Sequence, residues 1–388
     1  MKHTASIEQI RQGLVTDVYF ERAERILQSR RQNPEVRAEF VAKGLPENWP
    51  WAVFAGVEEC VELLRGFPVK VRALPEGTLF HPREPVMEIQ GRYLDFGRYE
   101  TALLGLICQA SGVATMAARC RKAAGDCPVN SFGARRMHPT VAPLVERNAF
   151  IGGCDDVALV LGGEILGRKA VGTMPHALIL ILGDTVEATR AFQEVMEPGV
   201  KVVSLIDTFH DEKFEAVAVA QALGKDLFAI RLDTPGSRRG DFLGIMREVR
   251  WELDLRGYGH VKIFLSGGLD EYQIARYNEA ADAYGVGTAI SNAPVVDFSM
   301  DIVEIEGKPM AKRGKRSGAK RIARCSRCLR TVVLPKGRRA PACPCGGRNE
   351  ELLRPILNHG ALEKKLPPAE ALRAYVLRQL KKVELEFS

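Results

Sequence analysis

Apolar segments of strand length alternate with segments of helical spacing through the middle of the chain. The strand-like segments are residues 129–132, 200–206, 227–232, 261–265 and 284–286. Helical spacing follows three of them, at 211–223, 241–255 and 270–278. Such βα units predict parallel pairing, in a barrel or a doubly wound sheet. Eight clear units cannot be counted, so an irregular or incomplete barrel is as consistent with the pattern as a regular one.

The flanking segments predict further elements. Helical patterns occur at residues 1–30, 51–65, 99–110, 113–122 and 369–385, and a small antiparallel unit is expected from 69–74 and 86–90. The predicted fold class is therefore α/β, with an irregular TIM-like barrel as its catalytic part. The expected domains are an N-terminal α+β domain (1–112, completed by C-terminal segments), the α/β barrel (113–300), a basic loop with a zinc-binding module (301–360) and a C-terminal helix (361–388).

Composition limits the class of protein. The chain has 388 residues, and its 46% hydrophobic content is enough for a large core. Its first residues lack the apolar core of a signal peptide, and the longest aliphatic run, 177–182, is too short to cross a bilayer. We therefore expect a cytoplasmic protein without a membrane partner. The net charge of +7 suits anionic ligands but does not require nucleic acid.

Charged and aromatic residues follow the first strand of the barrel pattern. Phe132 offers a face on which a flat heterocycle can stack, and Arg135 and Arg136 offer planar forks that match phosphate or carboxylate oxygens. A solvated loop with salt bridges is the alternative. The carboxyl ends of the strands are the functional face of such a sheet, which favours a binding site.

Two later segments add candidate chemistry. His176, in Gly172-Thr173-Met174-Pro175-His176, could act as a general base or accept a phosphoryl group, although a single histidine is more often structural. Asp207, Arg231 and Asp233 end two neighbouring strands. They could orient ribose hydroxyls, hold Mg²⁺ through water or bracket a ring, and a structural ion pair is the alternative.

Glycine-rich turns follow the last two strands. Their backbone N–H groups can approach phosphate oxygens, and the last strands of a barrel are the usual place for a phosphate site. The residues are Ser266-Gly267-Gly268 and Gly285-Val286-Gly287-Thr288. Each turn is a weak signal alone, but two in succession predict a phosphate-binding site.

Nine cysteines divide into two groups. Cys60, Cys108, Cys120, Cys127 and Cys154 are scattered, as buried free thiols are in cytosolic proteins. The other four form two close pairs, Cys325-x2-Cys328 and Cys343-x-Cys345. Four thiolates at this spacing predict a tetrahedral zinc site, and a closed four-thiolate shell predicts a structural rather than a catalytic role.

These motifs together resemble the nicotinate phosphoribosyltransferase family, along nearly the whole chain. The most specific are Thr16-Asp17-x-Tyr19, Ser131-Phe132-Gly133-Ala134-Arg135-Arg136, Gly152-Gly153-Cys154-Asp155, Gly172-Thr173-Met174-Pro175-His176, Ile230-Arg231-Leu232-Asp233 and Gly285-Val286-Gly287-Thr288. The cysteine module resembles a shorter, archaeal-like branch of that family. The resemblance implies transfer of 5-phosphoribosyl from phosphoribosyl pyrophosphate to the ring nitrogen of nicotinate in NAD biosynthesis, with Mg²⁺, and with ATP coupling through a phosphohistidine at His176.

The resemblance also implies roles for individual residues in a homo-oligomer whose active site lies at a dimer interface. Tyr19 of a second chain would stack the pyridine opposite Phe132, while Arg135, Arg136, Asp155 and Arg231 would lie near the ring. Asp155 would repel a nicotinate carboxylate, so we expect it to face ribose or Arg231. The phosphoribosyl pyrophosphate would contact Arg135, Asp207, Asp233, Ser266, Gly267, Gly268, Gly287, Thr288 and Lys312. His176, Asp233 and Arg231 would be the catalytic residues.

Three alternatives stay open. A nicotinamide or a quinolinate phosphoribosyltransferase would use much of the same machinery. A zinc-ribbon nucleic-acid binder belongs to another class, and it is indicated by seven basic and no acidic residues between Lys312 and Arg324 beside the cysteine module. Aromatic residues do not alternate with the basic ones there, so we expect no nucleic-acid partner.

Overall fold

The computed structural model describes residues 3–386, which form two compact units. Unit 1 combines the described residues up to Thr115 with Pro294–Glu386, and unit 2 is the continuous segment Met116–Ala293. Residues 1, 2, 387 and 388, at the ends of the two expected terminal segments, lie outside the described part.

Unit 2 contains a six-stranded parallel sheet, in the order β7-β6-β11-β10-β9-β8. Its strands are β6 (Val129–Ser131), β7 (Asp156–Val157), β8 (Val202–Leu205), β9 (Leu227–Leu232), β10 (Lys262–Ser266) and β11 (Ala283–Val286). In the described structure β7 and β8 are edge strands that do not pair with each other, so the sheet is an open half-barrel. The expected parallel α/β arrangement is confirmed, and of the barrel forms that the sequence left open the incomplete one is found.

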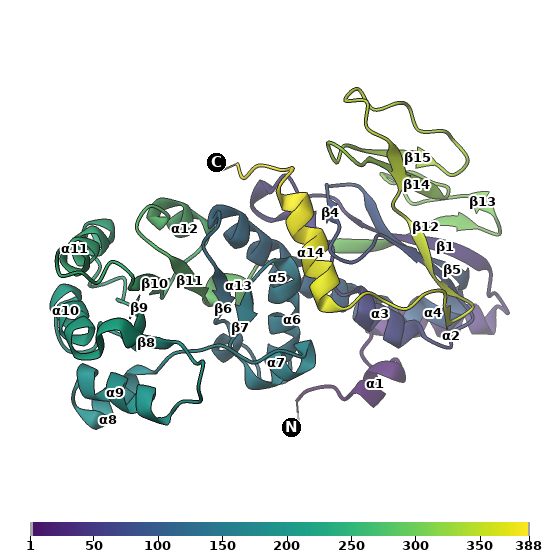
Figure 1. Cartoon of the computed structure of the whole chain (residues 1–388). Helices are drawn as coiled ribbons and strands as arrows, with labels where there is room; N and C mark the ends of the chain where they lie inside the picture. Colours follow the sequence, from purple (N-terminus) through teal and green to yellow (C-terminus); the bar gives the residue numbers. More distant parts are fainter. Residues whose placement is uncertain (1–2, 387–388) are drawn as a thin grey trace. The chain divides into compact units, whose positions relative to one another are not determined.

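Helices of unit 2 follow the strands, and Figure 1 shows α10 and α11 beside them. Their bounds are α6 (Ala142–Gly152), α7 (Val160–Leu166), α8 (His176–Leu182), α9 (Thr185–Val195), α10 (Glu212–Leu223), α11 (Phe242–Leu255), α12 (Glu271–Tyr277) and α13 (Thr288–Ser291). Aspartates at positions 211, 241 and 270 each accept a hydrogen bond from a first-turn N–H of the helix that follows. These caps explain why α10, α11 and α12 begin where the pattern predicted.

Unit 1 is built around a seven-stranded sheet with the order β13-β12-β1-β5-β3-β17-β18. Its strands are β1 (Glu35–Ala42), β3 (Lys70–Ala73), β5 (Pro85–Arg92), β12 (Phe298–Ile305), β13 (Lys308–Pro309), β17 (Arg354–Asn358) and β18 (Ala361–Leu362). β3 pairs antiparallel with β5, as the sequence predicted. A smaller sheet contains β14 (Lys320–Cys325), β15 (Thr331–Pro335) and β16 (Asn349–Glu351), and another pairs β2 (Ala52–Val53) with β4 (Leu79–Phe80).

Three helical predictions for the flanking segments need correction. The two helices expected at 99–110 and 113–122 are one helix, α5 (Glu100–Ala123). The predicted helix at 51–65 is β2 followed by α3 (Val57–Leu64), and the C-terminal helix α14 is Ala369–Leu380. The remaining helices of unit 1 are α1 (Ile7–Arg11), α2 (Val18–Ser29) and α4 (Tyr93–Phe96).

Gly112 explains why α5 looked like two helices. A Cβ atom there would lie 2.4 Å from the carbonyl oxygen of Pro294, so the glycine allows close contact rather than a break. In the described residues, 93–123 is the one stretch long and apolar enough to cross a membrane, and 67% of its most apolar window is buried. The core helix of a globular protein passes the same test.

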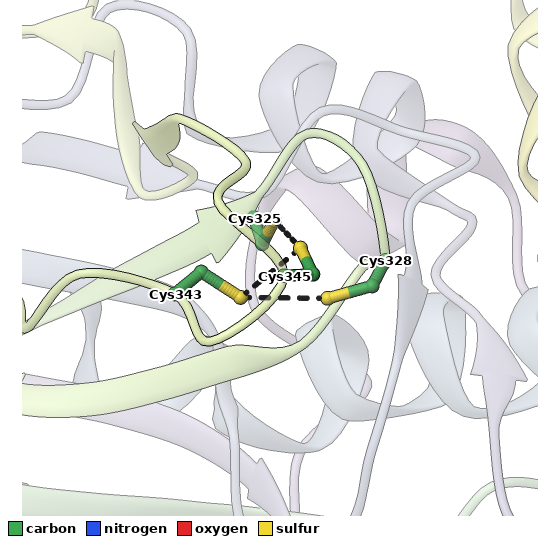
Figure 2. Close-up of side chains that lie close together, drawn as sticks. All are labelled: Cys325, Cys328, Cys343 and Cys345. Carbon is green, nitrogen blue, oxygen red and sulfur yellow. Dashed lines mark hydrogen bonds between the residues drawn. The ribbon is translucent and has the colours of Figure 1, made fainter.

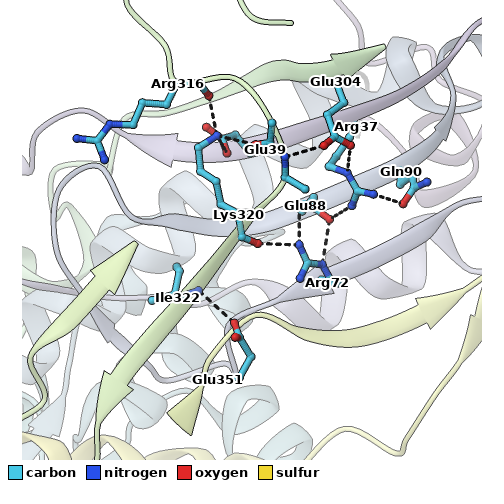
Figure 3. A network of polar contacts seen from close by, with 12 residues as sticks. Arg37, Glu39, Arg72, Glu88, Gln90, Glu304, Arg316, Lys320, Ile322 and Glu351 are labelled. Carbon is cyan, nitrogen blue, oxygen red and sulfur yellow. Dashed lines mark hydrogen bonds and ion pairs between the residues drawn. The ribbon is translucent and has the colours of Figure 1, made fainter. Parts of the chain in front are cut away.

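Buried charges join β1 to strands far away in sequence (Figure 3). Arg37 on β1 donates to Glu304 on β12 at 2.7 Å and also pairs with Glu88 on β5. Lys320 on β14 donates to Glu39 on β1 at 2.7 Å. These contacts satisfy charges that would be costly to bury alone, and they attach β14 to the large sheet.

Candidate active site

A cavity of about 790 Å³ opens in unit 2 among the loops that follow the parallel strands. Residues after β6, β7, β9, β10 and β11 all contribute to its lining, as expected for the carboxyl edge of a parallel sheet. The expected site residues on the lining are Phe132, Arg135, Arg136, Arg231, Asp233, Ser266, Gly267, Gly268, Gly287 and Thr288. Ten residues predicted from separate motifs therefore lie around one space.

Phe132 is held at the cavity by close packing. A Cβ atom on Gly285 would lie 2.4 Å from Cε2 of the Phe132 ring, so only glycine leaves room for the ring there. The ring centroid is 5.8 Å from that of Phe264 and 5.5 Å from the guanidinium carbon of Arg231. This packing gives the aromatic face a defined position, with a cation next to it.

Arg231 uses all three of its nitrogens within the protein. It donates from Nε to Ser266 Oγ at 2.8 Å, from Nη1 to Thr173 Oγ1 at 2.7 Å and from Nη2 to Asp233 Oδ2 at 3.2 Å. Ser266 Oγ also donates to Asp233 Oδ1 at 2.9 Å. The arginine therefore orients the carboxylate of Asp233 and links the ends of β9 and β10.

Arg135 and Arg136 differ from Arg231 in having exposed side chains. They lie in a short 3₁₀ turn, Ala134–Arg136, directly after β6 and Phe132. Within residues 3–386 neither guanidinium has a hydrogen-bonding or ion-pair partner. Two unpaired, planar guanidinium groups beside an aromatic face are suited to an anionic ligand that carries a ring.

The turn after β10 brings backbone close to Asp233. Gly267 and Gly268 have φ values of +82° and +58°, and a Cβ on Gly267 would lie 2.7 Å from Asp233 Oδ1. Arg239 donates from Nε to the Thr234 carbonyl at 2.7 Å and from Nη2 to the Gly267 carbonyl. Sequence reasoning missed Arg239, because it precedes its helix in a loop and belongs to no recognised motif.

His176 and Asp207 form a pair that does not line the cavity. His176 Nε2 lies 3.3 Å from Asp207 Oδ1, with the imidazole 40% exposed and the carboxylate 3% exposed. Burial raises the pKa of Asp207, His176 opposes that rise, and the charge of Asp233 adds to it. Asp207 is thus electrostatically linked to the cavity through Asp233, and in the described structure its buried Oδ2 has no hydrogen-bond partner.

Three further expected site residues are not on the lining. Asp155 accepts a hydrogen bond from the N–H of Val129, the first residue of β6, at 2.9 Å, so it lies at the amino end of the strand. Tyr19 and Lys312 belong to unit 1. Tyr19 is 57% exposed, and Lys312 Nζ is 2.6 Å from the buried carboxylate of Asp301.

The four clustered cysteines of unit 1 meet, as Figure 2 shows. Their sulfur atoms all lie within 4.8 Å of one another, with 3.4 Å between Cys325 and Cys345 and 3.5 Å between Cys328 and Cys343. Four sulfurs about 2.3 Å from a tetrahedral zinc would be about 3.8 Å apart, so the cluster fits a metal such as zinc. The backbone N–H of Cys328 is the main cause that lowers the pKa of Cys325 to about 6. The backbone N–H of Cys345 also lowers the pKa of Cys343, but burial and the other three thiols outweigh it and raise that pKa to about 12. The fit to a metal therefore rests on the sulfur spacing.

The scattered cysteines are not part of this cluster. Cys60, Cys120 and Cys154 are buried, while Cys108 and Cys127 are half-buried. Burial raises the pKa of Cys60 and of Cys120 well above the ordinary thiol value. These two are therefore unreactive core thiols.

Comparison with known proteins places this architecture in a family. Residues 17–111 match the family described as quinolinate phosphoribosyl transferase, N-terminal domain, and 113–301 match its C-terminal domain. A nicotinate phosphoribosyltransferase of Mycobacterium tuberculosis is 32% identical, and the match covers 84% of this chain and 82% of that protein.

Two solved structures share the fold. A structure described as nicotinate-nucleotide pyrophosphorylase from Pyrococcus furiosus is 54% identical over 100% of both chains, with a TM-score of 0.97. Human nicotinic acid phosphoribosyltransferase is 22% identical over 95% of this chain and 94% of that one, with a TM-score of 0.74. The sequence match to the mycobacterial protein and the fold agree with the motifs. The chain belongs to the nicotinate phosphoribosyltransferase family.

Proposed function

We propose that the protein transfers 5-phosphoribosyl from phosphoribosyl pyrophosphate to the ring nitrogen of nicotinate, giving nicotinate mononucleotide and pyrophosphate in cytoplasmic NAD biosynthesis. One observation carries this proposal: a single cavity joins the Phe132 ring, the free forks of Arg135 and Arg136, and the glycine turn beside Asp233. An aromatic face, unpaired cations and accessible backbone N–H groups are what a pyridine carboxylate and a phosphorylated sugar require.

The reaction requires that the pyridine ring and the ribose be positioned and that the charge of the leaving pyrophosphate be neutralised. The pyridine nitrogen supplies the electron pair for the new bond to C1 of the ribose, and the electrons of the breaking C1–O bond leave with pyrophosphate. No base is needed to activate the nitrogen. Phe132 would align the ring, Asp233 would face the ribose and the developing positive charge, and the glycine turns of β10 and β11 would hold phosphate groups.

Bound Mg²⁺ would neutralise pyrophosphate as it leaves. Asp233, on the lining, and Asp207, electrostatically linked to it, are the carboxylates that could hold the ion through water. Both are hard oxygen donors, which suits this ion. A metal held by the Cys325 cluster would have no part in the reaction, because four thiolates would close its coordination shell.

We further propose that ATP hydrolysis is coupled to the transfer through a phosphorylated His176. Asp207 holds Nε2 of the imidazole, which leaves Nδ1 available to take a phosphoryl group, and the ring is 40% exposed. The phosphoryl group would pass from ATP to Nδ1 and then to water, with ADP and phosphate as products.

We also propose that a second copy of the chain completes the active site. Tyr19 is an exposed aromatic residue of unit 1, and Asp17, Thr101 and Tyr19 lie together there, with Thr101 Oγ1 donating to Asp17 Oδ2 at 2.8 Å. In a homo-oligomer Tyr19 would stack on the face of the pyridine opposite Phe132, and Lys312 would contact phosphate.

Nicotinamide and quinolinate are the competing pyridines. The two free guanidinium groups of Arg135 and Arg136 favour an acid over the neutral amide. Quinolinate carries two carboxylates and would lose one as CO₂. The described lining holds no lysine or histidine that would add cations for the second carboxylate.

The test is to incubate the protein with phosphoribosyl pyrophosphate, Mg²⁺ and each of the three pyridines, and to measure mononucleotide and CO₂. We expect turnover with nicotinate at the highest kcat/KM and without CO₂. Absence of nicotinate turnover, or preference for another pyridine, would overturn the proposal. A second assay in each case measures ADP released per mononucleotide formed.

A further inference from the structure

Glu146 of α6 is a buried carboxylate next to the cavity, and no motif includes it. Its side chain has no solvent exposure. Oε1 accepts from Ser131 Oγ at 2.9 Å, and Oε2 accepts from the N–H of Ala158 at 2.8 Å and of Leu159 at 3.3 Å. Among the described residues it has no lysine, arginine or histidine as an ion-pair partner. The carboxylate therefore interacts with its surroundings by accepting three hydrogen bonds and not through an ion pair.

The three donors lie where two strands stop pairing. β6 and β7 pair through two positions, Asn130 with Asp156 and Ser131 with Val157. The next residues of these strands, Phe132 and Ala158, do not pair with each other, and both line the cavity. The N–H of Phe132 still donates to the Val286 carbonyl of β11 at 2.8 Å. Glu146 therefore joins the two chain segments at the point where the pairing between β6 and β7 ends.

Burying a carboxylate without a cation is unfavourable unless hydrogen bonds compensate. Burial raises the pKa of Glu146, and the bonds from Ser131, Leu159 and Ala158 oppose that rise. The surroundings are tightly packed as well, because a Cβ on Gly162 of α7 would lie 3.0 Å from Cβ of Glu146. The side chain has little freedom to move away from its three donors.

We propose that Glu146 is a positioning residue for the pyridine substrate: it fixes the spacing between Phe132 and the lining segment Ala158–Leu159. This inference rests on the proposed function, because it assigns the ring to that part of the cavity. In the described structure the hydrogen bonds of Glu146 go to Ser131, Ala158 and Leu159 and not to the glycine turns of β10 and β11. Its effect should therefore appear on the pyridine and not on phosphoribosyl pyrophosphate.

Two substitutions at position 146 distinguish the hydrogen bonds that the side chain accepts from the space that it fills. Glu146→Leu keeps a similar size but leaves the Ser131 hydroxyl and two backbone N–H groups without an acceptor. Glu146→Gln can keep its oxygen toward Ala158 and Leu159 and donate its amide to Ser131. We expect Glu146→Leu to raise KM for nicotinate about tenfold while KM for phosphoribosyl pyrophosphate stays within about twofold, and Glu146→Gln to stay close to the wild type.

Two less disruptive variants test the same inference if Glu146→Leu does not fold. Ser131→Ala removes one donor to Glu146, whereas Ser204→Ala removes a buried hydroxyl of β8 that lies 2.7 Å from Thr189 Oγ1, off the cavity lining. Ser131→Ala should raise KM for nicotinate about threefold, and Ser204→Ala should leave it unchanged. Equal effects of the two, or a parallel rise in both KM values, would overturn the inference with the proposed function intact.

Hydrogen exchange gives a readout that needs no turnover. In Glu146→Leu the amides of Ala158 and Leu159 should exchange faster than in the wild type, while amides of β9 keep their protection. Unchanged exchange at both amides would overturn the positioning role. A wild-type protein that turns over no pyridine would instead remove the proposed function, and exchange would still decide whether Glu146 holds the two strand ends together.

Discussion

Asp207 holds the imidazole of His176 from a buried position, with 3.3 Å between Oδ1 and Nε2. The carboxylate is 3% exposed and the imidazole is 40% exposed, so one partner is fixed and the other can meet a ligand. The same carboxylate responds to the charge of Asp233 on the cavity lining. Under the proposed function, a charge change at His176 would act on Asp207 and, through Asp233, on the cavity, and this link can be tested.

Replacing His176 should separate ATP hydrolysis from sugar transfer. We expect His176→Ala to abolish ADP release linked to turnover while some basal transfer remains, because the cavity lining is unchanged. The measurement is ADP formed per nicotinate mononucleotide. His210→Ala is the control, since His210 is the next histidine along this segment. Coupling that survives in His176→Ala and is lost in His210→Ala would move the phosphoacceptor to His210.

The free forks of Arg135 and Arg136 should bind the anionic substrate. Removing a charge-assisted hydrogen bond costs roughly 1.5–3 kcal/mol, so Arg136→Ala should lower kcat/KM about tenfold or more. Arg247→Ala is the matched control, because Arg247 is an exposed arginine paired with Glu279 outside the lining. Similar losses in both variants would show that general surface charge, and not this fork, is responsible.

Glycine at position 285 should be required for the aromatic face. A methyl group there would lie 2.4 Å from the Phe132 ring, so Gly285→Ala must displace the ring. We expect KM for nicotinate to rise about tenfold or more, together with lower thermal stability from overpacking. Gly236→Ala is the control, because a Cβ there has no neighbour within 4 Å. A Gly285→Ala enzyme with the wild-type KM would exclude Phe132 from pyridine binding.

The carboxyl of Glu100 in unit 1 should make stability depend on pH. Burial raises its pKa from 4.5 to about 7, Asp301 and Asp17 add to the rise, and Lys312 opposes it. The folded state thus retains a proton that the unfolded chain has lost, so stability should fall as pH rises from about 4.5 to 7 and then level off. Glu100→Gln should flatten the plot of melting temperature against pH in this range. If the variant has the same slope as the wild type, Glu100 is not the cause of the pH dependence.

Metal in the cysteine cluster should support folding more than chemistry. We expect elemental analysis to find about one zinc per chain, as a four-thiolate site requires. Cys325→Ser should lower thermal stability strongly while kcat of the folded fraction changes little. Cys127→Ser is the control, because Cys127 is half-buried and outside the cluster. A normal melting temperature in Cys325→Ser would refute a structural metal.

The parallel part of the fold could be predicted because its signals are local. Each strand of β8 to β11 is a mostly apolar segment, and the helices after β8, β9 and β10 begin at an aspartate cap. The glycines and charged residues at the strand ends then fall on one edge by geometry alone. Ten expected site residues lie on the cavity for that reason.

The burial and the long-range pairing of β1 could not be predicted, for the opposite reason. Its sequence places Arg37 and Glu39 among apolar residues, a pattern typical of a half-exposed strand, yet seven of its eight residues are buried. Arg37 finds its partner Glu304 267 positions away in the chain. A charge that is satisfied only by tertiary pairing carries no local signal, and the same holds for Glu146.

The chain path of the seven-stranded sheet has a consequence for folding during synthesis. Unit 2 is one continuous segment, so it can fold as soon as it has left the ribosome. β1 pairs with β12, and β3 pairs with β17, across more than two hundred residues. β1, β5 and β3 can pair with one another early. The outer edges of β1 and β3 must wait for β12 and β17, and this high contact order slows the completion of unit 1. During this interval the open edges of β1 and β3 can pair with another chain, which exposes the nascent protein to aggregation.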